Sequence, residues 1–364
     1  MTAKKIAIVG AGLAALVAAR ELSRSGLAVE IFDKGRFAGG RLASRSRDTN
    51  QFDYGAQYFA VRDPRFARFL EPLSTCRPEP IVVPWSAQIF DISRQGRSVH
   101  QSSHERYVAV PTMRALAQAL IDLPLETEPG SEEMAAVQFS LRLSSRVSSI
   151  SRSGNQSWLG FEDRSTAGPY DFVILNMPPQ QCLPFLGQSQ TLHDLASSVE
   201  MAPCWAVMLS FASRLGTDVQ AAFVEDYPCS WIACDSTKPG RPAGERWLVH
   251  GSAAWSGRHL QAEPDWVLAE LKGALLDCLG LDAAAAPAVI FSKAHRWRYA
   301  IAVNPAAEGA GLLDEEAGLA LCGDWLVHNR VEGAVLSGLN CAERLLSLGD
   351  FQPGQLKSEP HALL

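Results

Sequence analysis

Near its start the chain reads IAIVGAGLAALVAARELSRSGLAVEIFD over residues 6–33. The first four residues are apolar, which is typical of a parallel strand buried on both faces of a sheet. Gly10–Ala15 follows as a GxGxxA turn and opens a helix predicted to end near Ser25. Val29–Phe32 then gives a second predicted strand. The stretch therefore predicts the strand–turn–helix–strand unit of a Rossmann-type α/β fold.

Each part of this unit suits a dinucleotide. Gly10 allows the tight turn, and Gly12 has no Cβ, so a pyrophosphate can approach the backbone. The first helical N–H groups, at Leu13 and Ala14, point toward the phosphates at the positive end of the helix dipole. Asp33 stands 23 residues after Gly10, the position of a carboxylate that binds ribose hydroxyls. The same carboxylate disfavours a 2′-phosphate on this nucleotide.

A secretory signal is the competing interpretation of this segment. Lys4 and Lys5 precede an uncharged apolar run that ends near Ala19, as in such signals. The run is shorter than the roughly 20 apolar residues of a transmembrane helix. The second strand and Asp33 favour the folded interpretation, so we predict no targeting segment and no membrane span.

The composition narrows the class of protein. The 364 residues include 33 Lys and Arg against 39 Asp and Glu, so the formal net charge is −6, which argues against a nucleic-acid partner. Hydrophobic residues make up 47% of the chain, which excludes wholesale disorder. The eight cysteines form no CxxC pair and no zinc spacing. We therefore expect reduced thiols, no metal site and a cytoplasmic protein.

The next segment distinguishes FAD from NAD. Arg36 begins the pattern RxxGGRxxS, which resembles the loop that lies along FAD in the flavin amine-oxidase superfamily. The glycine pair that ends at Gly40 allows close approach of the backbone to a ligand. Arg41 has the planar fork that clamps a phosphate. We therefore predict FAD as the cofactor, and there is no second GxGxxG turn for a separate NAD(P)H domain.

A narrower resemblance lies in the stretch Phe52–Phe59, which is similar to the D-x-GAQY segment of the renalase family. The resemblance extends from Ile6 to about Leu348. It departs from the family at 124–136, which is longer and more acidic than expected. Other matching segments, in family order, are 203–206, 238–241, 249–250, 255–256, 295–300, 323–325, 330–334 and 337–338. The resemblance implies that Gln57 and Tyr58 lie near the flavin and that Val147 lies near the adenine.

The C-terminal motif has its own physical interpretation. Gly318–Cys322 is predicted as the last strand of the FAD sheet and ends at Gly323-Asp324. Asp324 is placed to bind a ribityl hydroxyl. A helix that begins near Gly333-Ala334 would turn its positive end toward the pyrimidine edge of reduced flavin. Glu332 is expected to orient this turn rather than to transfer protons.

The remaining aromatic residues suggest a substrate site. Five tryptophans, at 205, 231, 247, 255 and 297, fall within a hundred residues and suit a flat ring. His295 and Trp297 alternate with Arg296 and Arg298 on a predicted strand, so the imidazole and indole share one face. We predict His295 and Trp297 as the catalytic pair, although a structural role for the histidine remains an alternative.

These features predict an interleaved α/β fold, a Rossmann-type FAD-binding domain with an α+β substrate (cap) domain, as in p-hydroxybenzoate hydroxylase. Residues 1–60, 106–180 and 313–349 are assigned to the FAD domain, 61–105 and 181–312 to the substrate domain, and 350–364 to a flexible tail. The predicted cofactor residues are Gly10, Gly12, Leu13, Ala14, Asp33, Lys34, Gly40, Arg41, Gln57, Tyr58, Val147, Gly323, Asp324, Glu332, Gly333 and Ala334.

Three functions follow from the sequence. The resemblance implies an oxidase that converts the 2- and 6-dihydro isomers of NAD(P)H to NAD(P)+, with a hydride passed to flavin N5 and O2 reduced to hydrogen peroxide. A flavin amine oxidase, or a tailoring oxidoreductase on another small molecule, is the second interpretation. A non-enzymatic FAD-binding protein is the third, because fold alone does not determine function. The oligomeric state is not predicted.

Overall fold

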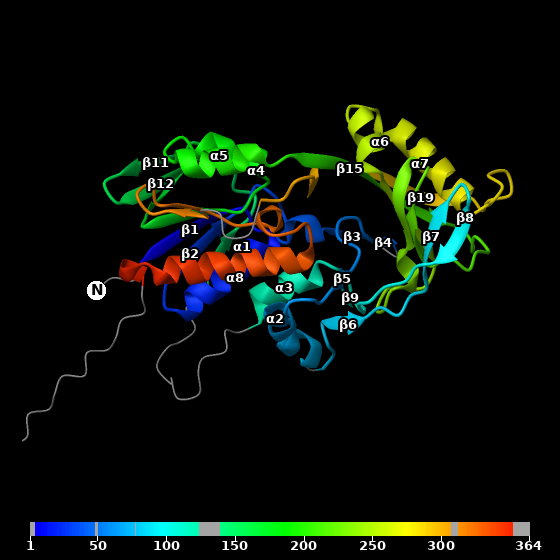
Figure 1. Ribbon diagram of the computed structural model, residues 1–364, viewed down its shortest axis with the longest axis horizontal. Coiled ribbons are helices and arrows are strands. Elements are labelled where there is room, and N and C mark those ends of the chain that lie inside the picture. The colour runs from blue at the N-terminus through cyan, green and yellow to red at the C-terminus, as the bar shows by residue number, and fades with distance from the viewer. Residues whose placement is uncertain (1–3, 48–49, 77, 124–138, 307–311, 352–364) are drawn as a thin grey trace, which may run out of the picture.

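The computed structural model describes residues 4–47, 50–76, 78–123, 139–306 and 312–351 (Figure 1). Its first sheet has the order β10-β2-β1-β14-β21-β20. The strands are β1 (Lys5–Val9), β2 (Ala28–Phe32), β10 (Ser140–Arg142), β14 (Phe172–Leu175), β21 (Leu319–Leu321) and β20 (Leu313–Asp314). All neighbours pair in parallel except β20, which is antiparallel to β21. The predicted Rossmann-type sheet is confirmed.

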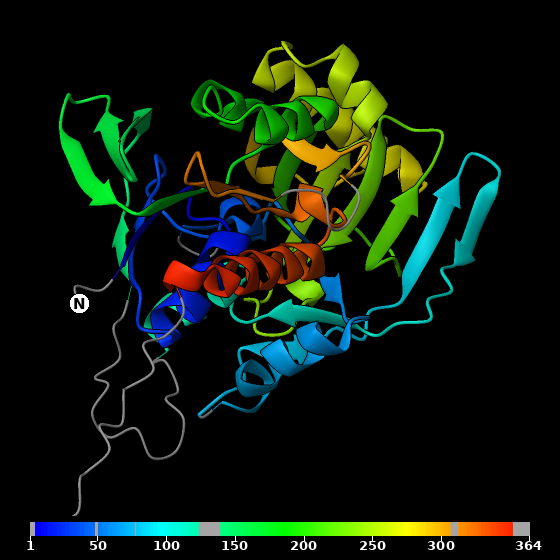
Figure 2. The same cartoon turned by 60° about the vertical axis from the view of Figure 1, so that its left-hand side comes forward.

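Both faces of this sheet are buried, as the apolar run in β1 predicts. Ile6 and Ile8 pack with helix α1 (Leu13–Arg24) and helix α8 (Val331–Ser347). Ala7 and Val9 point to the other face, which a three-stranded antiparallel sheet covers. That sheet comprises β11 (Val147–Ser153), β12 (Gln156–Phe161) and β13 (Thr166–Tyr170). Figure 2 shows α8 lying along the sheet.

Small residues let the two helices approach closely. A Cβ added to Gly338 of α8 would lie 2.5 Å from the backbone oxygen of Ala14 and 2.8 Å from the Cβ of Val17. Helix α3 (Ala115–Asp122) also contacts α1. The glycine therefore fixes how deeply α8 sits against the first helix.

A second sheet of seven strands, in the order β19-β15-β18-β17-β16-β7-β8, forms the substrate domain (Figure 1). Its strands are β19 (Val289–Ala302), β15 (Met201–Phe211), β18 (Glu245–Gly251), β17 (Cys229–Cys234), β16 (Ala221–Val224), β7 (Ile89–Ser93) and β8 (Gly96–Val99). Helices α6 (Ala253–Arg258) and α7 (Pro264–Cys278) cover one face, where Trp205, Trp247 and Trp255 are buried. The other face is turned toward the cofactor domain.

Short elements connect the two sheets. The hairpin of β3 (Ser44–Arg47) and β4 (Asn50–Asp53) lies between them, and β5 (Phe59–Ala60), β9 (Arg106–Ala109) and β6 (Val82–Pro84) make a small sheet of their own. The remaining elements are η1 (Gly40–Leu42), α2 (Pro64–Thr75), α4 (Pro179–Cys182), η2 (Leu183–Phe185), α5 (Gln190–Ser198), η3 (Asp235–Thr237), η4 (Asp324–Leu326) and η5 (Gly349–Phe351). Segment 61–105 therefore contacts both domains. Its strands β7 and β8 belong to the seven-stranded sheet, whereas its helix α2 contacts α8 beside the first sheet.

The sequence also predicts a strand over 85–90, a strand over 141–150 and a helix from Pro111 to about Leu123. Each of these three predictions needs correction, for a tertiary reason. The run Leu141–Ile150 is two strands in different sheets, because the Ser144 and Ser145 N–H groups turn to bond the carbonyls of Gly35 and Asp33. Segment 85–88 is not a strand, because Trp85 turns into the core beneath Tyr58. The helix expected from Pro111 begins at Ala115, because the Met113 and Arg114 N–H groups bond side chains of β3 and β4 instead.

The predicted insertion 124–136 lies outside the described residues. So does most of the predicted tail, although Phe351 within it is buried and its ring packs edge-on against Phe172 at 5.8 Å. Among the helices of the described residues, none is both long and apolar enough to cross a membrane.

Candidate active site

The turn after β1 has the shape expected for a phosphate site. Gly10 has φ +103°, a conformation that side chains rarely adopt, and a Cβ there would lie 2.1 Å from the Asn176 oxygen. Gly12 precedes α1, and its own N–H is bonded to Asn176 Oδ1 at 3.0 Å. No side chain in the described part of the chain caps this helix, so the first-turn N–H groups at Leu13 and Ala14 are left available for an anion.

The predicted ribose acid stands where the sequence places it, directly after β2. Its two carboxylate oxygens accept the N–H groups of Ala11 and Gly35, each at 2.6 Å. Asp33 therefore braces the turn after β1, and its bond to a ribose stays a prediction. Lys34 donates to Gln181 Oε1 at 3.2 Å. Val147 begins β11 and is buried, at the end of the segment that crosses beside Asp33.

The glycine-rich loop is attached to the first turn. The Gly39 N–H donates to the Ala11 carbonyl at 2.8 Å, and a Cβ on Gly40 would lie 3.4 Å from the Gly12 Cα. Arg41 then reaches two distant elements: it donates to Asp324 Oδ1 at 2.5 Å and to the Ala300 carbonyl of β19 at 3.0 Å. Two predicted cofactor residues, Arg41 and Asp324, are thus neighbours although 283 positions separate them.

The start of α8 lies beside this pair. Gly323 ends the loop after β21, and its N–H donates to Ser337 Oγ at 2.9 Å. Glu332 is buried, and its Oε1 accepts the N–H groups of Arg62 and Asp63 at 2.7 and 2.8 Å, so it orients the chain before α2. Gly333 leaves room for the His328 carbonyl, which would lie 2.1 Å from a Cβ. Ala334 completes the first turn by donating to Arg330.

The segment Tyr54–Tyr58 joins the cofactor loop to the substrate sheet. The N–H groups of Tyr54 and Ala56 donate to the carbonyls of Ala43 and Arg41 at 3.2 and 2.9 Å. On its other side, the Tyr54 carbonyl accepts the Trp297 indole N–H at 2.9 Å and lies 3.3 Å from His250 Nε2. The segment is therefore held from both domains.

The predicted catalytic pair belongs to an aromatic cluster with Tyr54. The rings of His295 and Trp297 lie 4.4 Å apart, and the Tyr54 ring lies 4.8 Å from His295 and 5.5 Å from Trp297. Arg296 points away, to the Leu260 carbonyl at 2.6 Å, as the alternation predicts. The sheet register extends the site face into one row of opposed residues: His295, Ala206, His250, Trp231, Phe223 and Asp91.

Two imidazoles on this face are neutral near pH 7. Burial lowers the pKa of His250 from 6.5 to about 4, against the opposing effect of the Tyr54 carbonyl. Burial also lowers the pKa of His295 to about 4, and the charge of Lys293 acts in the same direction. Neither ring supplies a strong acid or a strong base at neutral pH.

Gln57 and Tyr58 lie at the other end of the segment. Gln57 is buried and bonded within the protein, to Lys238 and to the carbonyls of Asp53 and Gly55. The Tyr58 ring lies 5.5 Å from Trp231 and 6.0 Å from Trp85. Their contact with a flavin stays a prediction.

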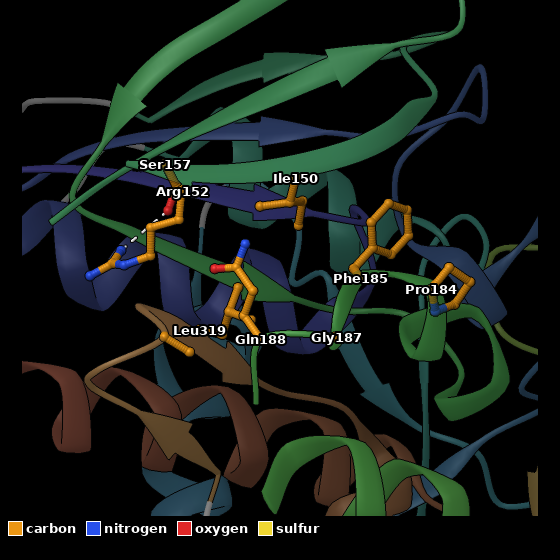
Figure 3. A pocket seen from close by; sticks show the side chains of 9 residues that line it. Ile150, Arg152, Ser157, Pro184, Phe185, Gly187, Gln188 and Leu319 are labelled. Carbon is orange, nitrogen blue, oxygen red and sulfur yellow. Dashed lines mark hydrogen bonds between the residues drawn. The ribbon is translucent and has the colours of Figure 1, made fainter. Parts of the chain in front are cut away.

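The hollow in Figure 3 lies elsewhere, between the three-stranded sheet and η2. Arg152 lines it and donates to Ser157 Oγ at 3.2 Å. Phe185 and Gln188 are also among its lining residues. No predicted site residue lines it, so the hollow plays no part in the site built above.

Sequence reasoning missed the residues that hold the cluster together. Tyr54 and His250 lie within segments that resemble the renalase family, yet neither was predicted as a site residue. The clue for His250 is the sheet register, in which His250 stands opposite Ala206 and Ala206 stands opposite His295. Tyr54 is identified only by its contacts with Trp297 and His295. Both relationships depend on the pairing of distant segments, which local spacing does not contain.

Comparison with known families decides the class. The model of flavin-containing amine oxidoreductases matches residues 93–346 of the chain. The chain belongs to this family. A model of the NAD(P)-binding Rossmann-like domain matches residues 8–73, which include the turn after β1. The protein is thus an FAD-dependent oxidoreductase that acts on a small molecule, and the open turn and uncapped helix α1 fit the dinucleotide.

Three solved structures share the fold over almost the whole chain. A candidate protoporphyrinogen oxidase from Exiguobacterium sp. 255-15 superposes with a TM-score of 0.73, at 14% identity, over 95% of this chain and 99% of that one. A putrescine oxidase variant with redesigned cofactor binding superposes with a TM-score of 0.66 at 11% identity, over 95% of this chain and 100% of that one. An oxidoreductase from Methanosarcina mazei superposes with a TM-score of 0.65 at 14% identity, over 93% of this chain and 100% of that one. At 11–14% identity, these similarities show a shared fold and nothing about the substrate.

Proposed function

We propose that the protein oxidises a dihydronicotinamide, a 2- or 6-dihydro isomer of NAD(P)H, as the renalase family does. The main support is the distribution of charge around the Tyr54–His295–Trp297 cluster. An amine that enters as an ammonium ion needs an anionic or basic group, whereas a dinucleotide needs cations for its phosphates. The charged groups around the cluster favour a dinucleotide.

The carboxylates between the cofactor loop and the substrate sheet are already engaged. Asp53 and Asp235 are paired with buried cations, and Asp324 is paired with Arg41. Glu332 accepts two backbone N–H groups. These four acids therefore offer little to an incoming ammonium ion.

Basic side chains flank the cluster instead. Lys293 is exposed two residues before His295, on the same face of β19. The Arg45 guanidinium lies 5.8 Å from the Phe291 ring centre, on the same side of the sheet. These cations suit the phosphates of a dinucleotide and repel an amine cation.

Neutral imidazoles also fit hydride transfer better than amine oxidation. An alkylammonium has a pKa near 10, so a base with a pKa of about 4 removes its proton poorly. A dihydronicotinamide loses a hydride from carbon and needs no base. His295 and Trp297 would then form a wall that orients the flat ring.

The reaction balances with one oxidant. FAD, when bound, supplies the two-electron acceptor that takes the hydride and passes both electrons to O2. The sum is dihydronicotinamide plus O2 plus H+ giving NAD(P)+ plus hydrogen peroxide. The protein's part is to orient the ring, bind the phosphates and exclude water from the cluster.

Amine oxidation is the second candidate, favoured by the aromatic cluster itself. Tyr54 and Trp297 lie nearly parallel, with 20° between their planes, and aromatic faces attract cations. This alternative requires that an amine enter as the free base or that a basic group outside the cluster take its proton.

One experiment separates the two. The FAD-loaded protein is mixed without oxygen with 6-dihydro-NAD, β-NADH and a panel of amines, and the flavin absorbance is followed. We expect rapid bleaching by the isomer and not by β-NADH, and a slower rate for His295→Asn with FAD still bound. Bleaching by an amine, with none by the isomer, would establish the alternative.

We also propose a reducing compartment, the cytoplasm. All eight cysteines are free thiols, and Cys229 and Cys278 share a thiol hydrogen bond at 3.7 Å between their sulfurs and form no disulfide.

A further inference from the structure

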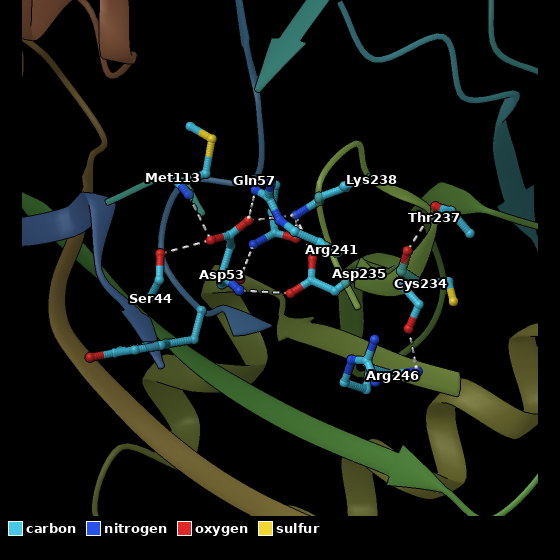
Figure 4. A network of polar contacts seen from close by, with 12 residues as sticks. Ser44, Asp53, Gln57, Met113, Cys234, Asp235, Thr237, Lys238, Arg241 and Arg246 are labelled. Atoms are coloured by element: carbon cyan, nitrogen blue, oxygen red, sulfur yellow. Dashed lines mark hydrogen bonds and ion pairs between the residues drawn. The ribbon is translucent and has the colours of Figure 1, made fainter. Parts of the chain in front are cut away.

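Four buried charges meet where the two domains touch (Figure 4). Asp53 ends β4 of the cofactor side, and Asp235, Lys238 and Arg241 follow β17 of the substrate sheet. Their side chains are at most 1% exposed. Two acids face two bases, so the formal charges of the cluster cancel.

The Lys238 ammonium lies among three side-chain oxygens. It donates hydrogen bonds to Gln57 Oε1 at 3.2 Å and to Asp53 Oδ2 at 3.4 Å, and it forms an ion pair with Asp235 Oδ1 at 2.5 Å. Arg241 completes the charge balance by donating to Asp53 Oδ2 at 2.6 Å. Burial alone would raise the pKa of Asp53, but the two cations outweigh it and hold that pKa below its ordinary value.

Lys238 also determines which way the Gln57 amide faces. An ammonium has no acceptor, so only the amide oxygen can meet it. The amide nitrogen is thereby turned to the carbonyls of Asp53 and Gly55, the second at 3.2 Å. A flipped amide would place N–H against N–H and lose all three contacts.

The hydrogen bonds from the Gln57 amide to the Asp53 and Gly55 carbonyls close a turn within the Tyr54–Tyr58 segment, and both ends of this segment contact other parts of the protein. At one end the Tyr54 carbonyl meets Trp297 and His250. At the other end the Tyr58 ring packs on Trp85 and Trp231. The amide that Lys238 orients therefore lies within the part of the chain that links the cofactor loop to β19.

We propose that Lys238 is a positioning residue, which acts through Gln57 to fix the Tyr54–Tyr58 segment between the cofactor loop and the substrate sheet. In this role Gln57 shapes the turn and does not bind the cofactor directly. The inference goes beyond the proposed function, because it holds for any substrate.

The test uses the FAD-loaded protein and variants that keep the buried charge balanced. Lys238→Met/Asp235→Asn removes one cation and one anion together, Gln57→Leu removes only the amide, and a third variant combines them. Asp218→Asn is the control, because Asp218 pairs with Arg97 at the exposed end of the substrate sheet. The readouts are hydrogen exchange of the peptide 53–59 and the midpoint potential of the bound flavin.

We expect both variants to speed exchange of this peptide by about tenfold to a hundredfold, the range for losing a hydrogen bond to a charged group. Both should shift the flavin potential in the same direction, and the combination should add little. Unchanged exchange overturns the proposal, as does a combined effect equal to the product of the separate ones. Faster exchange with an unchanged potential also overturns it, because the cluster is then purely structural. If the charge variant does not fold, Gln57→Leu decides by the same readouts.

Discussion

Trp297 donates its indole N–H to the backbone carbonyl of Tyr54 at 2.9 Å, while the two rings lie nearly parallel at 5.5 Å. The bond joins β19 of the substrate sheet to the segment that follows the cofactor loop. Because the same tyrosine is tied to the Ala43 carbonyl, the wall of the proposed site belongs to both domains. Its shape therefore depends on how the domains meet.

Loss of this bond should affect both stability and catalysis. Trp297→Phe keeps an aromatic ring but leaves the Tyr54 carbonyl with His250 alone. We expect the free energy of unfolding to fall by about 1 kcal/mol and flavin reduction by 6-dihydro-NAD to slow about fivefold. Urea denaturation and stopped-flow absorbance measure the two effects.

Trp266→Phe is the matched control. Trp266 of α7 stacks on Trp255 of α6 at 5.7 Å, on the far face of the sheet, and is 41% exposed. The Trp266→Phe variant should leave the rate of flavin reduction unchanged. Equal slowing in both variants would contradict the role assigned to Trp297.

The sequence predicted what local spacing determines. The turn with Gly10 and Gly12, the helix after it and the position of Asp33 all follow from short-range rules, and the structure confirms these elements. The shared face of His295 and Trp297 follows from strand alternation and is also confirmed.

What local spacing misses is the pairing of distant segments. Lys238 meets Asp53 across 185 positions, so no periodicity connects them. Trp85 looks like a strand residue in an apolar run, yet its place is decided by Tyr58 and the core beneath it. The domain boundaries and the cofactor contacts of the remaining site residues stay predictions for the same reason.

Arg41 offers a direct test of the cofactor loop. Arg41→Gln removes the fork that joins Asp324 to the Ala300 carbonyl and leaves a half-buried carboxylate unpaired. We expect the Kd for FAD to rise about tenfold or more, since hydrogen bonds to charged groups contribute about 1.5–3 kcal/mol. Fluorescence of released FAD measures it. Arg97→Gln breaks a similar pair with Asp218 on the exposed surface and should leave the Kd unchanged, so equal weakening would argue against the assignment.

Two helical glycines provide a paired test of the packing beneath the site. In Gly338→Ala the new methyl meets the Ala14 oxygen at 2.5 Å, so we expect a loss of about 1–3 kcal/mol in unfolding free energy. Gly273 of α7 has no atom within 4 Å of an added Cβ, so Gly273→Ala should instead gain about 0.5–1 kcal/mol. Urea denaturation of both variants measures the difference. If Gly273→Ala also lowered the unfolding free energy, the loss in Gly338→Ala could not be assigned to the contact with Ala14 alone.

The two histidines of the site face should make stability depend on pH. Each has a pKa of about 4 when folded and about 6.5 when unfolded, because burial disfavours the charged ring. Between these values the unfolded chain binds more protons, so stability is lost as the pH falls from 6.5 toward 4. The slope is up to about 1.4 kcal/mol per pH unit for His250, and smaller for the more exposed His295.

Urea denaturation between pH 5 and 6.5 tests this dependence in a range where most carboxylates of the unfolded chain are already ionised. His250→Asn should remove the larger part of the slope and His295→Asn the smaller part, with the double variant losing both. A His250→Asn slope equal to that of the unaltered protein would mean that this ring is protonated equally in the folded and unfolded chain. The folded pKa of His250 would then lie near its ordinary value of 6.5, and burial would not be what disfavours the charged ring.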